Sequence, residues 1–142
     1  MERISRDNML IQMAEVMAQR GTCSRLQVGA VFSREGRIIA TGYNGAPRGI
    51  DHCDHQAGGD LDDTGGCLVA EHAERNAIAF AARYGLGLDR SEVHVTHAPC
   101  LACARSIINA GVVRLSFLHP YRITAGVELL GKAGIEVVAM DA

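Results

Sequence analysis

The spacing of apolar residues predicts a helix at the start of this chain. Four apolar residues recur at three- and four-residue intervals, namely Leu10, Met13, Ala14 and Met17. This is the period of one face of an α-helix. The pattern predicts a first helix over residues 6–20, with Ser5 as its N-cap and Gly21 at its end.

Two stretches after the first helix have the composition of β-strands. Residues 27–33 and 37–42 are rich in β-forming side chains, and Glu35-Gly36 between them predicts a hairpin turn. Residues 44–66 then form a long stretch, rich in glycine and aspartate, with no apolar period. Loops of this length inside a compact domain are usually functional or hold a metal.

Helical and strand patterns alternate through the rest of the chain. Helices are predicted at residues 71–84, 100–110 and 125–133, and strands at residues 92–96, 112–118 and 135–140. Gly85, Gly111 and Gly134 each follow a helical pattern, where glycine commonly ends a helix. The alternation predicts an α/β fold with a mainly central sheet.

Length and composition favour one globular domain over residues 1–142. The hydrophobic share is 48% and the charged share 21%, which are ordinary values for a soluble protein. No run of about eighteen apolar residues occurs, and the N-terminus lacks the apolar core of a signal peptide. We therefore expect a cytoplasmic protein with no membrane partner.

Charge and cysteine content narrow the candidate partners. The formal net charge is −2, so the chain has no general attraction to polyanions, which weighs against a nucleic-acid partner. The five cysteines are an odd number, and in a cytoplasmic chain they indicate metal ligands and free thiols rather than disulfides.

Two short motifs carry the chemistry, His-Ala-Glu at residues 72–74 and Pro-Cys-Leu-Ala-Cys at residues 99–103. Cys100 and Cys103 are three positions apart at a predicted helix start, so both sulfurs are expected on one face. With His72 they make three zinc ligands and leave a fourth tetrahedral position for water, as in catalytic sites. Glu74 would lie beside that water and transfer its protons.

Other functions remain open for these residues. A Cys-x-x-Cys pair alone is also typical of structural zinc sites and of redox proteins. A redox protein would depend on Cys100 and Cys103 but not on His72. A noncatalytic protein that binds nucleotides through a zinc fold is a further alternative, although it would have no need of Glu74.

The complete set of motifs resembles the zinc deaminases, and more narrowly the deoxycytidylate deaminases of the cytidine deaminase superfamily. The likeness rests on five segments: VGAV at 28–31, TGYNGAPRG at 41–49, HAERNAI at 72–78, VTHAPCLACARSIINAG at 95–111 and AGIEV at 133–137. It implies a three-layer α/β/α sandwich with a five-stranded central mixed sheet. It also implies hydrolysis of dCMP to dUMP and ammonia, which feeds dTMP synthesis.

The resemblance assigns roles to individual residues. It implies His72, Cys100 and Cys103 as zinc ligands and Glu74 as the proton shuttle. The substrate contacts that it implies are Asn44 at the sugar, Arg48 and Asn76 at the 5′-phosphate, and Tyr121 near the pyrimidine. For Asn44 a turn role beside Gly45 is an equal alternative.

The resemblance leaves open a second metal site, because some members of this family carry an additional structural zinc. The residues available for it are Cys23, His52, Cys53, His55 and Cys67, with Cys23 and Cys53 the favoured pair. Such a site would order the long loop that contains most of them. The alternative is that these residues are free buried cysteines and exposed histidines.

The resemblance also implies partners, and the sequence departs from the family pattern at two places. Family members are commonly hexamers, and several are activated by dCTP and inhibited by dTTP, so a homo-oligomer with these effectors is expected. Arg105 stands where the family usually has lysine, and the segment at residues 58–66 has no clear counterpart. Cytidine, dCTP, a 5-modified dCMP, a purine base and adenosine in tRNA are the alternative substrates.

Overall fold

The computed structural model describes residues 1–141, which form four α-helices, five strands and one 3-10 turn. In chain order these are α1 (Arg6–Ala18), β1 (Gly29–Arg34), β2 (Arg37–Tyr43), η1 (Gln56–Gly58), α2 (Ala73–Tyr84), β3 (Glu92–His97), α3 (Leu101–Asn109), β4 (Arg114–His119), α4 (Ala125–Lys132) and β5 (Glu136–Ala139).

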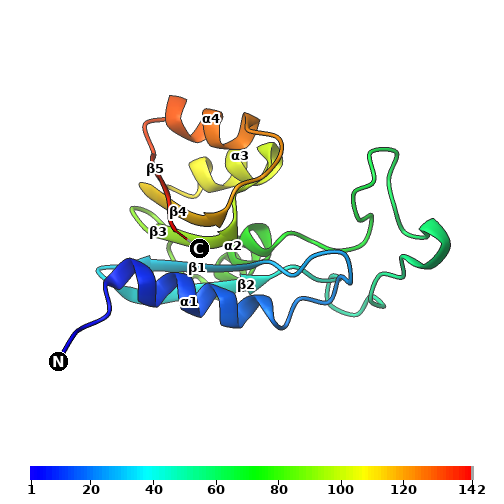
Figure 1. Ribbon diagram of the computed structural model, residues 1–142, viewed down its shortest axis with the longest axis horizontal. Helices are drawn as coiled ribbons and strands as arrows, with labels where there is room; N and C mark the ends of the chain where they lie inside the picture. The colour runs from blue at the N-terminus through cyan, green and yellow to red at the C-terminus, as the bar shows by residue number, and fades with distance from the viewer. Residues whose placement is uncertain (142) are drawn as a thin grey trace.

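The strands make one mixed sheet in the order β2-β1-β3-β4-β5 (Figure 1). β1 pairs antiparallel with both β2 and β3, whereas β3, β4 and β5 are parallel. The parallel strands need crossover connections, and α3 and α4 supply them. This arrangement confirms the predicted five-stranded mixed sheet.

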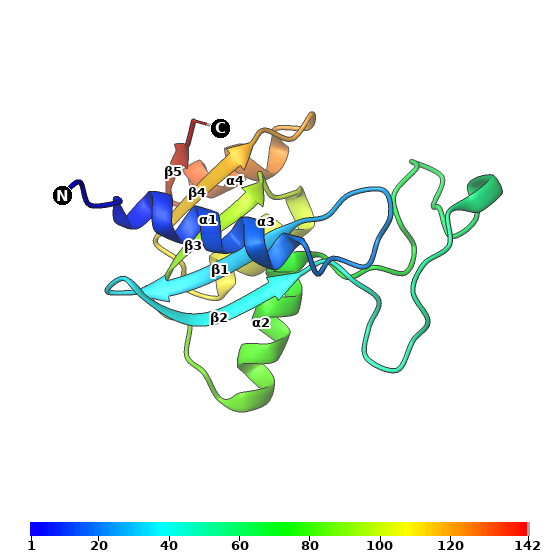
Figure 2. The same cartoon turned by 60° about the horizontal axis from the view of Figure 1, so that its bottom comes forward.

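Helices cover both faces of the sheet, which confirms the three-layer sandwich. α1 lies on one face, and α2, α3 and α4 lie on the other (Figures 1 and 2). The main core fills the second side, where Phe32, Val93 and Leu115 of the sheet meet Ala77 of α2 and Ile107 of α3. Each of these side chains is fully buried.

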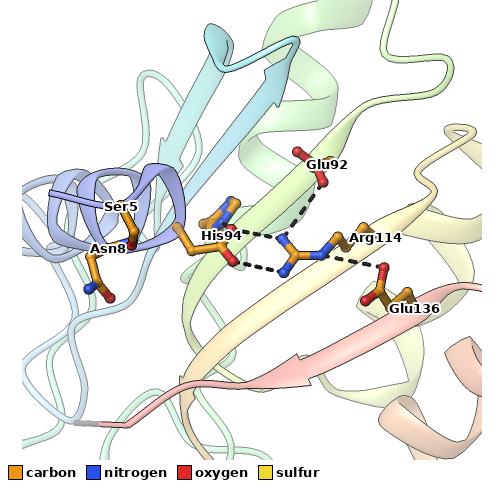
Figure 3. A network of polar contacts seen from close by, with 7 residues as sticks. Ser5, Asn8, Glu92, His94, Arg114 and Glu136 are labelled. Atoms are coloured by element: carbon orange, nitrogen blue, oxygen red, sulfur yellow. Dashed lines mark hydrogen bonds and ion pairs between the residues drawn. The ribbon is translucent and has the colours of Figure 1, made fainter. Parts of the chain in front are cut away.

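The contact between α1 and the sheet is partly polar. Its apolar part is small and consists of Leu10, Ala14 and Val31. Beside it, Asp7 accepts two hydrogen bonds of 2.8 Å from the Arg114 guanidinium and lies 2.8 Å from Nε2 of the buried His94 (Figure 3). The Asp7 carboxylate therefore joins α1 to β3 and β4.

Most predicted element ends lie within two residues of the observed ones, and the differences have local causes. The Ser5 side chain caps α1 by accepting a 3.1 Å hydrogen bond from Asn8 N–H. β1 begins at Gly29 instead of residue 27 because Val28 N–H donates to the Asn44 side chain. The hairpin forms as predicted, with positive φ at both Glu35 (55°) and Gly36 (75°), as a type I′ turn requires.

The long loop between β2 and α2 projects away from the sheet and folds back on itself (Figures 1 and 2). Two isolated bridges hold it, Gly45 with Glu71 and Leu61 with Cys67. Regular structure within it is limited to the short turn η1.

Over the described part of the chain, no helix combines the length and apolar character needed to cross a bilayer.

Candidate active site

Two helix N-termini meet at the predicted metal ligands. His72 is the N-cap of α2 and Cys100 is the N-cap of α3, with Cys103 one turn further along α3. Neither N-cap side chain makes a capping hydrogen bond. The positive ends of both helix dipoles therefore face this cluster, which favours thiolate over thiol.

The distances within the cluster fit a zinc ion. His72 Nδ1 lies 3.4 Å from Cys100 Sγ and 3.3 Å from Cys103 Sγ. In a tetrahedral site, ordinary Zn–N and Zn–S bonds place nitrogen and sulfur about 3.5 Å apart. Three ligands complete this set and leave the fourth position available to water.

The two thiols titrate as a strongly interacting pair. A hydrogen bond from Cys103, helped by His72, outweighs burial and lowers the pKa of Cys100 to about 3. The same contact and burial raise the pKa of Cys103 above its ordinary value. One thiolate therefore forms readily, and metal binding would displace the remaining proton.

Glu74 lies beside the three ligands without belonging to their set. Its side chain is only 3% exposed, and burial raises its pKa to about 7. The nearby Cys100 thiolate also raises this pKa, while Glu74's own backbone N–H and His72 lower it. A carboxyl group that titrates near neutral pH can both take and give a proton.

A second cluster brings together four of the five residues predicted for another metal: Cys23, Cys53, His55 and Cys67. His52 is not part of it. Cys23 Sγ lies 3.3 Å from His55 Nε2, again a distance that suits zinc. His55 Nδ1 is 3.0 Å from the Gly59 carbonyl, and donation there leaves Nε2 free to bind a metal.

The sulfurs of this second cluster interact as those of the first do. Burial raises the pKa of Cys23, but hydrogen bonds from the Arg25 and Leu26 backbone N–H groups and from His55 and Cys53 bring it to about 7. Burial and the neighbouring sulfurs raise the pKa of Cys53 to about 12. Three sulfurs and one imidazole form a closed set of four ligands, as in structural zinc sites.

A cavity of about 440 Å³ opens next to the first cluster. Its lining includes His72, Glu74 and Cys100 from the helix starts, His97 from the end of β3, and Tyr121 from just beyond β4. Cavities of this size commonly hold small ligands, and in α/β sheets they lie at the carboxyl ends of the strands.

The structure brings two of the four predicted substrate residues to this cavity. Asn44 and Tyr121 line it, whereas Arg48 and Asn76 do not. The Asn44 side chain accepts from Val28 N–H at 2.7 Å and donates to the Leu26 carbonyl at 2.6 Å. Asn76 donates to the Tyr43 carbonyl at 2.9 Å. Both amides thus fix the backbone near the site.

Four polar residues of the cavity lining were not predicted from the sequence: Arg25, Thr64, His97 and Arg122. His97 Nδ1 lies 2.9 Å from the Thr96 hydroxyl, and its ring packs 4.8 Å from that of His119. Burial, followed by the charge of His119, lowers the pKa of His97 and favours a neutral ring. The position of His97 shortly before Pro99-Cys100 was the sequence signal that could have indicated it as a site residue. The two arginines lie in loops.

The family model for the cytidine and deoxycytidylate deaminase zinc-binding region matches residues 4–119. The chain belongs to this family. ComE operon protein 2 of Bacillus subtilis is 39% identical to it, over 99% of this chain and 74% of that protein. The deoxycytidylate deaminase of Enterobacteria phage T4 is 31% identical, over 90% of this chain and 86% of the phage enzyme.

A solved structure resembles the fold closely over the full length. The dCMP deaminase of cyanophage S-TIM5, determined in complex with dCMP and dUMP, superposes with a TM-score of 0.85 at 32% identity. The match covers 99% of this chain and 100% of the phage chain. The order and arrangement of the elements are therefore those of a known deaminase fold.

Proposed function

We propose that this protein catalyses the zinc-dependent hydrolytic deamination of dCMP to dUMP and ammonia. One observation carries the proposal: Glu74, only 3% exposed, lies beside three zinc ligands at a cavity of nucleotide size. The similarity to deoxycytidylate deaminases of phage T4 and cyanophage S-TIM5 supports dCMP as the substrate.

Each residue then has a defined task. His72, Cys100 and Cys103 would hold the zinc, which when bound lowers the pKa of water toward neutral. Glu74 would take a proton from that water and deliver it to N3 of the cytosine as the water oxygen bonds to C4. It would then carry the proton of the new C4 hydroxyl group to the amino group, which leaves as ammonia. One carboxyl group thus both takes and gives each proton of the cycle.

Asn44 and Tyr121 are the substrate contacts that the cavity supports. Both line it, Asn44 buried at 8% exposure and Tyr121 open to solvent at 37%. We assign the sugar to Asn44 and the pyrimidine to Tyr121. Arg48 and Asn76 stay predictions for the 5′-phosphate, with Asn76 acting through the backbone that it holds.

Ammonia release from the zinc-loaded protein tests this function. The substrates to compare are dCMP, CMP, deoxycytidine, dCTP and 5-methyl-dCMP. We expect dCMP to be converted to dUMP with the highest kcat/KM. Higher activity on dCTP or 5-methyl-dCMP would reassign the substrate, and no turnover of any of them would refute the proposal.

We further propose that the second cluster holds a structural zinc through Cys23, Cys53, His55 and Cys67. Four ligands within 4.8 Å of one another, and the bond from His55 to Gly59, support it. Elemental analysis of fully loaded protein should give two zinc ions per chain, and Cys53→Ala should give one. A single ion in the unchanged protein would refute the second site.

Assembly, regulation and location follow from the family resemblance. We propose a single catalytic domain that forms a cytoplasmic homo-oligomer, a hexamer, activated by dCTP and inhibited by dTTP. Light scattering in the presence and absence of each nucleotide would test the assembly. Initial rates at low dCMP concentration would test the effectors.

A further inference from the structure

Two irregular segments form one wall of the active-site cavity, and the second metal cluster joins them. Residues 23–28 connect α1 to β1, and residues 64–70 close the long loop before α2. Each segment supplies one ligand of the second cluster that also lines the cavity, Cys23 in the first and Cys67 in the second.

Arg25 lies between two fixed points in the first of these segments. On one side, two residues before it in the chain, lies Cys23, a ligand of the second cluster. On the other side, the Asn44 side chain holds the Leu26 carbonyl and Val28 N–H. The backbone that carries Arg25 is therefore anchored by a metal ligand and by a buried amide.

The charge of the lining favours an anion near Arg25. Arg25 and Arg122 are both exposed and both line the cavity, so they lie where it opens to solvent. Glu74, at the zinc ligands, is the only carboxylate in that lining. The cavity is thus acidic only at its metal end and basic at its opening.

The Arg25 charge also acts on Asp62, as the smallest of the causes that lower the pKa of that carboxyl group. Its Oδ1 already accepts hydrogen bonds from Thr64 and Gly66. Within residues 1–141, no carboxylate lies within ion-pair distance of Arg25. The guanidinium is left available to a ligand.

We propose that the Cys23–Cys53–His55–Cys67 metal site positions Arg25 to bind the 5′-phosphate of the substrate, so that this second metal governs the preference for a nucleotide over a nucleoside. The inference rests on the proposed deaminase function and on the proposed second zinc. A phosphate monoester matches the forked guanidinium, and it lies at the end of dCMP opposite the reacting amino group.

The direct test compares ligands that differ only in the phosphate. Calorimetry measures the binding of dUMP and of deoxyuridine to Arg25→Ala, and kcat/KM is measured for dCMP and deoxycytidine. We expect a loss of about 10- to 100-fold for both phosphorylated ligands and less than about twofold change for both nucleosides. Two zinc ions per chain should remain.

Arg20→Ala is the matched control, because Arg20 is also an exposed arginine between α1 and β1 but lies outside the cavity lining. It should leave the affinities for dUMP and deoxyuridine unchanged. Unchanged dUMP affinity in Arg25→Ala, or an equal loss of it in Arg20→Ala, would overturn the assignment of Arg25.

The variant Cys53→Ala tests the role of the second metal, since Cys53 is a ligand of the second cluster that does not line the cavity. It should lose one zinc ion and show the same selective loss of dUMP affinity. His55→Ala replaces it if the first variant does not fold. Loss of one ion with unchanged dUMP affinity would refute the coupling.

Different outcomes would refute this inference and the two proposals on which it rests, the second zinc and the deaminase function. A single zinc ion in the unchanged protein would remove the second metal and with it the proposed coupling, while the Arg25→Ala comparison would still decide the phosphate contact. An unchanged protein that neither binds dUMP nor deaminates dCMP would instead refute the deaminase function, and with it the phosphate assignment.

Discussion

At the scale of single residues, the site depends on one carboxyl group kept out of water. Glu74 is buried beside sulfur ligands, and burial is the largest contribution to its raised pKa. In water the same group would be ionised at neutral pH and a poor proton donor. Glu74 is the second residue of α2, two positions after the N-cap His72.

Glu74→Gln tests this role with little change in shape. We expect kcat to fall by about 10²- to 10⁴-fold, because the amide cannot transfer protons as the carboxyl group does. Zinc content and thermal stability should stay close to those of the unchanged protein, since Glu74 is outside the ligand set. Ordinary activity in this variant would remove Glu74 from the mechanism.

At the scale of elements, close contact between α4 and the start of α3 supports the zinc ligands. Gly126 in the first turn of α4 lies against the backbone of Pro99 and Cys100, where an added Cβ would overlap the two carbonyl groups. Glycine therefore lets α4 approach the backbone of a metal ligand. Gly131 in the same helix meets no atom within 4 Å of an added Cβ.

Gly126→Ala should separate α4 from α3 and disturb Cys100. We expect a loss of about 1–3 kcal/mol in the free energy of unfolding, as overpacking usually costs, and weaker zinc retention in a chelator titration. Gly131→Ala is the control and should be neutral or stabilising by up to about 1 kcal/mol. Equal effects of the two substitutions would contradict the contact.

At the scale of the whole molecule, one carboxylate holds the α1 layer on the sheet. The hydrogen bond from Arg114 is the largest cause that lowers the pKa of Asp7 well below its ordinary value, and it outweighs burial. The contribution of Asp7 to stability is therefore complete above the pKa of the unfolded chain, about 3.9. It is lost as the pH falls through that value toward the lower folded pKa.

Asp7→Asn measures this contribution. We expect it to lower the free energy of unfolding at pH 7 by about 1–2 kcal/mol, a modest value because the Asp7 side chain is 34% exposed and partly screened. The gap to the unchanged protein should narrow between pH 5 and pH 3 in urea titrations. Glu15→Gln, at an exposed position of the same helix, should show no such gap.

The sequence by itself determined the elements and the two motifs of the first cluster, because each of these depends on neighbours along the chain. Apolar spacing marks each helix and strand, and the motifs at residues 72–74 and 99–103 each occupy one helix start. Cys100 and Cys103 lie within one turn, so their joint role was readable from their spacing alone.

Only the tertiary structure decided the second cluster and the basic opening of the cavity. Cys23 and Cys67 are distant in sequence, and the loops that carry them have no periodic pattern that predicts a meeting point. Folding selected His55 over His52, and it brought Arg25 and Arg122 rather than Arg48 to the cavity. Loop positions follow from packing against remote segments, which local spacing does not encode.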